Sequence, residues 1–209
     1  MKNNYNRIAP FYDTLVRFAF GDCQKKAQTY YLSQIDEDAK ILVVGGGSGH
    51  FIPELFRLKP AIEIDYLEPA PKMIALAKKQ LSSNASNQIN FIEQKLEDVA
   101  LTDQDYDCIL TFFFFDIFKP KKSAQLHAKL LPSLKENGKW LMADFNPPQR
   151  LHHKLWIKLM FLFLYFSVKA DQKSIYHYKT LFSKHSFSLE ESKEFCKKLF
   201  FSSVYRKRT

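Results

Sequence analysis

The chain has 209 residues, of which 46% are hydrophobic and 25% charged, the composition of a globular protein with a substantial core in one domain. Its formal net charge of +9 arises wholly from residues 145–209, which hold 13 Lys/Arg against 4 Asp/Glu. No apolar run reaches the roughly 18 residues of a membrane span, and the first residues contain no apolar signal core.

Hydrophobic periodicity predicts two helices within residues 3–35, broken near residues 20–22, and then an alternation of strands and helices. The expected elements are strand 41–44, helix 51–58, strand 61–67, helix 71–81, strand 89–93, strand 107–113, helix 123–135 with Ser123 as its N-cap, and strand 139–145. Such alternation is typical of a doubly wound α/β fold with a mostly parallel sheet.

The end of the chain is predicted to form a helix over residues 188–199, capped by Ser188, and one strand over residues 201–207. If only one strand forms there, the sheet either has six strands or takes its last strand from elsewhere in the tail. Three cysteines, Cys23, Cys108 and Cys196, stand far apart with no metal-ligand spacing. We therefore expect no disulfide framework, no metal site and a reducing, cytoplasmic compartment.

The most informative motif follows the first strand, where Gly45, Gly47 and Gly49 are spaced two apart. Glycine there lets a ligand lie against bare main chain at the start of a helix. The dinucleotide fingerprint G-x-G-x-x-G fails in both registers, since His50 or Ser48 stands where a glycine is needed. A nicotinamide-dependent oxidoreductase is thereby disfavoured.

The G-x-G-x-G spacing resembles the class I S-adenosylmethionine (SAM) methyltransferases, and the likeness continues through AIEIDYLEPAPKMIALAKK. Glu68 ends the second strand nineteen residues after Gly49, near the distance at which an acidic side chain meets ribose hydroxyls in such folds. The resemblance implies SAM as cofactor, with its methionine part on the backbone of Gly45, Gly46 and Gly47, its ribose on Glu68, and its adenine near Pro69 and Met73. Gly49 is a further expected residue of the cofactor site.

Two positions depart from the family pattern. Lys95 stands where the family usually has an Asp for the adenine amine, which leaves Leu96 to offer apolar packing and a backbone N–H. Val43 stands where an acidic residue is usual, near the methionine ammonium. Thr111 and Phe112, which end the fourth strand, are assigned to the cofactor site by the same resemblance.

Within the family, the segments NRIAPFYD and LMADFNPP look like the ubiquinone/menaquinone C-methyltransferase group. That likeness implies Tyr12, or else Tyr5, beside the cofactor. The alternative for Tyr12 is an aromatic side chain that covers the sheet. Asn146-Pro147-Pro148 is similar to a motif of amino-N methyltransferases, but it follows the fifth strand rather than the fourth, so we interpret it as a rigid strand exit.

A general base is needed only where the acceptor must lose a proton. The candidates are Asp116, beyond the fourth strand, and His152 and His153, beyond the fifth, since ligands bind outside the carboxyl ends of the strands in open α/β sheets. Each also has a simpler interpretation, with Asp116 capping a turn and the two histidines at a solvated helix start.

The apolar segment 155–168 has one charge, Lys158, and basic flanks. It is interpreted as an acceptor lid, a dimer face, an interfacial helix on anionic lipid, or core packing. We expect a single domain over 1–209, with a helical cap at 1–40, a SAM-binding core at 41–146 and an acceptor or lid segment at 147–209.

The expected function is methyl transfer from SAM to the oxygen or carbon of a small, apolar acceptor. Two alternatives stay open. One is an RNA methyltransferase that uses the basic tail Tyr205-Arg206-Lys207-Arg208, and the other is a SAM-binding protein without catalysis.

Overall fold

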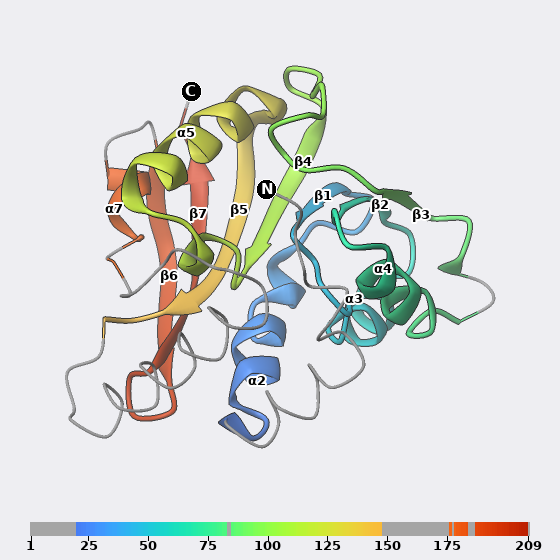
Figure 1. Cartoon of the computed structure of the whole chain (residues 1–209), viewed down its shortest axis with the longest axis horizontal. Helices are drawn as coiled ribbons and strands as arrows, with labels where there is room; N and C mark the ends of the chain where they lie inside the picture. Colours follow the sequence, from blue (N-terminus) through green and yellow to red (C-terminus); the bar gives the residue numbers. More distant parts are fainter. Residues whose placement is uncertain (1–19, 83–84, 148–175, 177, 184–186, 209) are drawn as a thin grey trace.

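The computed structural model describes residues 20–82, 85–147, 176, 178–183 and 187–208 (Figure 1). Its helices and strands, in chain order, are α2 (Cys23–Thr29), η1 (Leu32–Gln34), β1 (Lys40–Val44), α3 (Ile52–Leu58), β2 (Glu63–Leu67), α4 (Pro71–Lys78), β3 (Ile89–Ile92), β4 (Tyr106–Phe112), η3 (Phe115–Ile117), α5 (Pro120–Leu130), η4 (Leu131–Ser133), β5 (Leu134–Phe145), α7 (Thr180–Ser183), β6 (Phe187–Phe195) and β7 (Phe200–Lys207).

The strands described form one seven-stranded sheet in the order β3-β2-β1-β4-β5-β7-β6. The first five strands pair in parallel, and β7 runs antiparallel between β5 and β6. The predicted doubly wound, mostly parallel α/β fold is confirmed. The strand order reverses between β1 and β4, and in such sheets the crevice at this reversal is where ligands bind.

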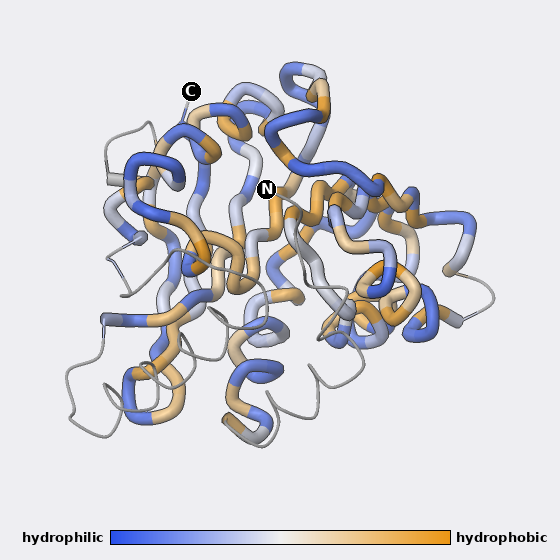
Figure 2. The backbone as a smooth tube through the Cα atoms, in the orientation of Figure 1, coloured by the Kyte–Doolittle hydropathy of each residue, from blue (hydrophilic) through white to orange (hydrophobic). Residues whose placement is uncertain are grey.

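Most of the predicted elements in the first two thirds of the chain are present. β1 is buried after its first residue, as expected for a central parallel strand, and Figure 2 shows it as hydrophobic over most of its length. α3 and α4 each carry a proline in the first turn, where the missing N–H costs no helical hydrogen bond. These prolines fix where the two helices begin.

The prediction of a helix over 188–199 is wrong, because residues 187–195 form strand β6 and pair with β7 as an antiparallel hairpin. The strand expected over residues 201–207 is confirmed as β7. Of the two alternatives for the last strand, the one that takes it from elsewhere in the tail holds, since β6 supplies it and the sheet is not six-stranded. The run Glu190-Glu191-Ser192-Lys193-Glu194 has good helix propensity, but pairing along β7 overrides that preference. Charged side chains on this outermost strand also discourage pairing with another chain.

Two predicted boundaries also move. α5 begins at Pro120 with Lys119 as its N-cap, so Ser123 lies inside the helix, where its hydroxyl donates to the Lys119 carbonyl at 3.3 Å. β5 begins at Leu134 instead of residue 139, with an irregularity in its pairing to β4 and Asn137 in a left-handed conformation. The predicted Asn137-Gly138 turn is thus a bulge inside one long strand.

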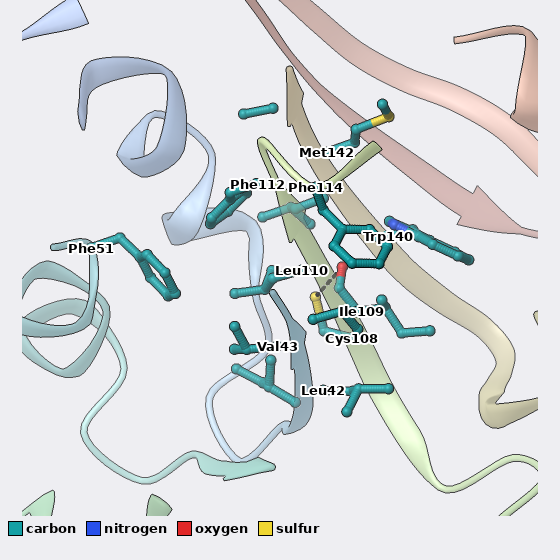
Figure 3. Close-up of a cluster of buried hydrophobic side chains, with 14 of the residues drawn as sticks. Leu42, Val43, Phe51, Cys108, Ile109, Leu110, Phe112, Phe114, Trp140 and Met142 are labelled. Carbon is teal, nitrogen blue, oxygen red and sulfur yellow. Dashed lines mark hydrogen bonds between the residues drawn. The ribbon is translucent and has the colours of Figure 1, made fainter. Parts of the chain in front are cut away.

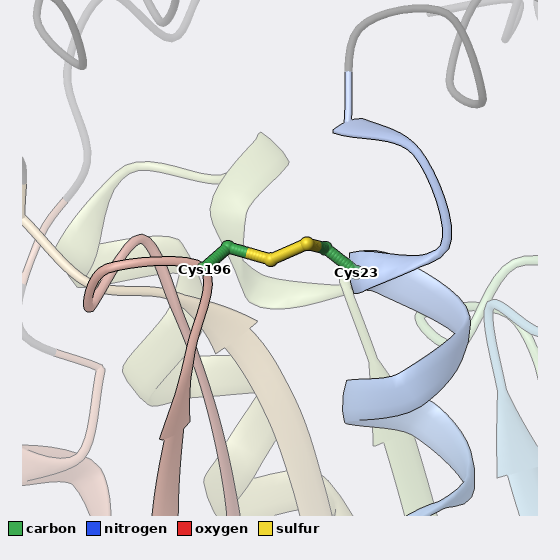
Figure 4. Close-up of a disulfide and its surroundings, with 2 residues drawn as sticks. All are labelled: Cys23 and Cys196. Atoms are coloured by element: carbon green, nitrogen blue, oxygen red, sulfur yellow. A yellow bond between two sulfur atoms is a disulfide. The ribbon is translucent and has the colours of Figure 1, made fainter.

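The expectation that the cysteines stay unpaired is also wrong. Cys23, at the start of α2, forms a disulfide with Cys196, in the turn between β6 and β7, with the two Cα atoms 6.1 Å apart (Figure 4). That separation lies in the normal range for disulfides. Cys108 is free and buried in β4. Sequence spacing could not reveal the pair, since 173 residues separate its members.

Opposite faces of the sheet's second half are covered by different helices. On one face, the Trp140 ring of β5 stacks on His127 of α5 and meets Phe182 of α7 edge-on. On the other, Phe20 beside α2 packs edge-on against Phe145 of β5 and Phe200 of β7. The basic, aromatic tail thus supplies part of the core through β7 and α7, in addition to its surface charge.

Candidate functional site

The glycine turn joins β1 to α3 at the strand reversal of the sheet. Gly45, Gly47 and Gly49 have positive φ angles of 64°, 60° and 72°, a backbone region that other residues rarely adopt. A Cβ added at Gly45 would lie 2.6 Å from the Phe114 ring, whereas one at Gly47 would meet nothing within 4 Å. The turn is therefore tightly packed at its base and open at Gly47.

Glu68 lies directly against this turn. Its carboxylate accepts hydrogen bonds from the Gly47 N–H at 3.1 Å and from the Ala70 N–H at 2.9 Å. The side chain is only 6% exposed, and burial raises the pKa of Glu68 to about 7 even though the two N–H donors oppose the shift. Each oxygen keeps a lone pair free for a further donor.

Tyr66 is a residue of the site that sequence reasoning missed. Its hydroxyl donates to the Gly47 carbonyl at 3.0 Å, and its ring lies where a side chain at Gly46 would have to be. The ring is fully buried, and burial raises the pKa of Tyr66 well above its usual value. Tyr66 and Glu68 thus hold the carbonyl and the N–H of one glycine. The one sequence feature that pointed to Tyr66 is its position, since it stands two residues before Glu68.

The residues expected near an adenine surround the exits of β2 and β3. Met73 of α4 is buried in a small apolar cluster with Ala70, directly beyond Glu68, and Pro69 is half-buried. Leu96 is buried and Lys95 half-buried just after β3, whose Ile92 carbonyl accepts the Glu68 N–H at 3.1 Å. These segments therefore lie on the same side of the turn as Glu68.

The end of β4 bounds the other side of the turn with aromatic rings. The Phe112 ring meets Phe51 edge-on at 5.2 Å, beside the apolar side chains of β1 and β4, including Val43 (Figure 3). Thr111 points elsewhere: it is fully buried, and its hydroxyl accepts a hydrogen bond from the Trp140 indole at 2.9 Å. Phe113 has a φ of 53°, a strained conformation for a bulky residue, where the chain leaves the strand.

Asp116 lies in η3, just after this aromatic run, and beside Asp144 at the end of β5. The Asp116 side chain is 5% exposed and that of Asp144 is 0% exposed. Burial, followed by the negative charge of Asp144, raises the pKa of Asp116, and burial raises the pKa of Asp144 to about 7. Asp144 was not a sequence candidate, because its proximity to Asp116 depends on β4–β5 pairing.

Three candidate residues, Tyr12, His152 and His153, lie outside the described residues, as does the apolar segment 155–168. In the part of the chain that the structure describes, no helix has both the length and the apolar character needed to cross a bilayer.

The chain is similar to known methyltransferases and related proteins. Residues 41–138 match the family model described as a methyltransferase domain. The chain is 23% identical over 145 residues to a carboxy-S-adenosyl-L-methionine synthase of Campylobacter hominis, covering 64% of this chain and 60% of that protein. It is 27% identical over 146 residues to a demethylmenaquinone methyltransferase of Thermotoga maritima, covering 69% and 61%. The chain thus spans about three fifths of the length of these relatives.

Among solved structures, a 1,6-didemethyltoxoflavin-N1-methyltransferase of Burkholderia thailandensis, bound to its substrate and S-adenosylhomocysteine, superposes with a TM-score of 0.69. The match covers 99% of this chain and 87% of that protein at 11% identity. Likeness at this identity establishes a shared fold.

Proposed function

The chain has the fold of the class I SAM-dependent methyltransferases and a methyltransferase domain at residues 41–138, and on this premise we propose that it binds SAM and transfers the methyl group to a small acceptor. The observation that carries the proposal is the contact between Glu68 and the N–H of Gly47. This hydrogen bond connects Glu68, the proposed ribose-binding residue, to Gly47, the one glycine of the turn that has open space beside it.

The residues present fit such a cofactor. The open face of Gly47 admits a ligand against the main chain, and the buried carboxylate of Glu68 can accept two further hydrogen bonds from a ribose diol. We assign the methionine part to the backbone of the turn, flanked by Phe112. The apolar cluster of Met73 with Ala70, together with Pro69 and Leu96, is the proposed adenine surface, and Lys95 lies at its edge.

A direct contact of the Thr111 side chain with the cofactor is less favoured than its place in the sequence suggested, because its hydroxyl accepts a hydrogen bond from the Trp140 indole inside the core. Its proposed role is therefore support of the Phe112 backbone. Tyr12 remains our proposed aromatic partner of the cofactor.

SAM supplies a methyl group on a positively charged sulfur, which is already a strong electrophile. The protein's part is alignment and exclusion of water, for which the aromatic rings Phe51, Phe112 and Phe114 provide an apolar surface. Asp116 is our proposed proton acceptor, because it lies beyond β4, on the opposite side of the turn from Glu68. His152 and His153 are kept as further candidates.

A small, apolar acceptor agrees with the aromatic residues that end β4. The tail is less suited to RNA than its sequence suggests, since Arg206 is paired with Glu190, Lys207 with Glu136, and the Tyr205 ring is buried against Phe182. Methyl transfer to oxygen or carbon is the proposed reaction. The printed activity of the Thermotoga relative, on demethylmenaquinone, makes quinone-like compounds a first acceptor class to test.

The direct test is calorimetric titration with S-adenosylhomocysteine. We expect micromolar binding by the wild type and its loss, by at least about tenfold, in Glu68→Ala and in Gly47→Asp, which places a carboxylate in the open space of the turn. Glu63→Ala, at the exposed opposite end of β2, is the matched control and should bind normally. Unchanged affinity in both site variants would refute the assignment.

Transfer itself is tested with radiolabelled SAM and fractionated lipid, small-molecule and RNA extracts. Label in the first two fractions supports the proposal. Label in RNA alone, with steep salt dependence, favours the RNA alternative, and binding without label in any fraction favours a non-catalytic SAM-binding protein.

A further inference from the structure

Asp116 and Asp144 are two carboxyl groups that the fold buries together at the ends of β4 and β5. Each has one oxygen, Oδ1 of Asp116 and Oδ2 of Asp144, with no hydrogen-bond partner among the described residues. A buried carboxylate oxygen without a donor is costly, so a purely structural pair would be expected to carry compensating contacts. The two oxygens are thus available to a shared proton or to a proton-donating ligand.

Asp144 lies at the end of β5, which is tied to the loop that carries Asp116. Its Oδ1 accepts the Phe145 N–H at 2.7 Å, and in the preceding residue the Ala143 carbonyl accepts the Phe113 N–H at 2.7 Å. The end of β5 therefore holds the chain just before η3, next to the residue that bears the Asp144 carboxyl group.

We propose that Asp144 is a positioning residue for the transfer: it holds its buried carboxyl group beside Asp116, so that Asp116 can take the proton of an acceptor hydroxyl. The inference rests on the proposed methyltransferase function. It narrows the acceptor class to compounds with an ionisable hydroxyl, such as phenols and enols, and disfavours acceptors with no proton to lose.

The new bond joins an acceptor oxygen, or the ring carbon conjugated to it, to the methyl carbon, while the electrons of the broken carbon–sulfur bond stay on sulfur. For oxygen as the acceptor atom, the hydroxyl proton moves to the Asp116 carboxylate. For carbon, the hydroxyl proton moves first to the Asp116 carboxylate; the methylated ring carbon then loses its proton to water, and the oxygen regains a proton from Asp116, which restores the hydroxyl.

Among the residues that the structure describes, few other charged groups lie on the elements packed around this pair. Asp144 is register-paired with Phe201 of β7, whose ring carries the Lys179 ammonium 4.3 Å from its centre. Glu194 of β6 is paired with the same Phe201, and the Tyr178 hydroxyl donates to the Phe118 carbonyl after η3. Of these groups, Asp144 is the one whose charge acts on Asp116.

The test uses full-length protein with 13C-labelled aspartate, titrated by NMR with S-adenosylhomocysteine present. In the wild type, we expect at least one of the two carboxyl groups to stay protonated above pH 6. In Asp144→Asn, the Asp116 midpoint should fall by at least about one pH unit, while S-adenosylhomocysteine affinity stays within about threefold. Asp103→Asn, an exposed carboxylate before β4, is the control and should change neither.

Catalysis gives the second measurement, made on the extract fraction that accepts label. The rate falls as pH drops through the Asp116 pKa, because the protonated acid cannot take a proton. Asp144→Asn should therefore move the acid limb of kcat to lower pH and reduce kcat, whereas Asp116→Asn should reduce kcat without raising the KM for SAM.

Two results would overturn the inference: wild-type carboxyls that both titrate below pH 5, or an acid limb that stays in place in folded Asp144→Asn. The first does not depend on any variant folding. If the wild type fails to bind S-adenosylhomocysteine, the proposed function is refuted. If it binds but the titration of Asp116 does not depend on Asp144, only this inference is refuted.

Discussion

Gly46 must be a glycine because of its neighbour, since its own φ is not among the positive values of the turn. A Cβ there would overlap the tip of the Tyr66 ring, which is fixed by its hydrogen bond to Gly47. Gly46→Ala should therefore destabilise the protein by about 1–3 kcal/mol, the usual cost of overpacking a core. Urea denaturation measures this change.

A double-mutant cycle separates that clash from any general sensitivity of the turn. Tyr66→Leu removes the ring tip, so Gly46→Ala should cost clearly less in the Tyr66→Leu background than in the wild type. Equal costs in both backgrounds would show that Tyr66 does not restrict position 46.

The raised pKa of Glu68 makes the free energy of unfolding depend on pH in a predictable direction. The native carboxyl keeps its proton up to a pKa of about 7, whereas the unfolded one releases it near 4.5. The native state therefore binds more protons between these values, and stability falls as pH rises through this window, by at most roughly 3 kcal/mol. Glu68→Gln cannot titrate, so its stability should fall less between pH 4.5 and pH 8.

Urea denaturation at the two pH values checks this, with Glu63→Gln as a control that keeps the wild-type slope. Asp116 and Asp144 contribute to wild type and variant alike, so they cancel in the difference. A Glu68→Gln variant with the same pH dependence as the wild type would mean that Glu68 is ionised in the fold at neutral pH.

At the scale of elements, the disulfide between Cys23 and Cys196 links α2 to the β6–β7 turn across a sequence separation of 173 residues. A loop of this size corresponds to about 5 kcal/mol in the chain-entropy model, and measured gains are commonly smaller. We expect a reducing agent to lower Tm in the wild type but not in Cys23→Ser. Cys108→Ala, which removes the free buried thiol, should keep that sensitivity.

Thiol counting in denaturant provides an independent check. The unreduced wild type should show one reactive thiol and the reduced protein three, since the sequence holds three cysteines and one is free in the structure. Three thiols without reduction would contradict the linkage.

The elements that sequence predicted well are those whose burial is local in origin. β1 and β4 are continuous apolar runs, and prolines mark the starts of α3 and α4. The prediction for residues 187–195 failed because most of these residues are exposed and several are helix-favouring Glu and Lys. Their strand conformation in β6 depends on pairing with β7. Asp116 was a candidate from the sequence, but its proximity to Asp144 depends on the pairing of β4 with β5 and could not be predicted.

At the scale of the whole molecule, the strand order reverses between β1 and β4, and we assign the cofactor to one half of the sheet and the acceptor to the other. The proposed cofactor half could be identified from the glycine spacing and Glu68, because both belong to one short segment of chain, β1-α3-β2. The contacts that give Tyr66 and Asp144 their proposed roles, across the turn and between β4 and β5, could not be predicted. The acceptor half therefore depends most on tertiary structure.

This division predicts that cofactor binding survives loss of the apolar segment 155–168. Every described residue that we assign to SAM lies between Gly45 and Phe112, and the segment falls in the connection from β5 to α7. Replacing it with a Gly/Ser linker of equal length should leave S-adenosylhomocysteine affinity within about threefold while abolishing methyl transfer to the acceptor. Calorimetry and the radiolabel assay measure the two effects separately. If affinity and Tm fall together, the segment belongs to the core, and the acceptor must be bound by the ends of β4 and β5 alone.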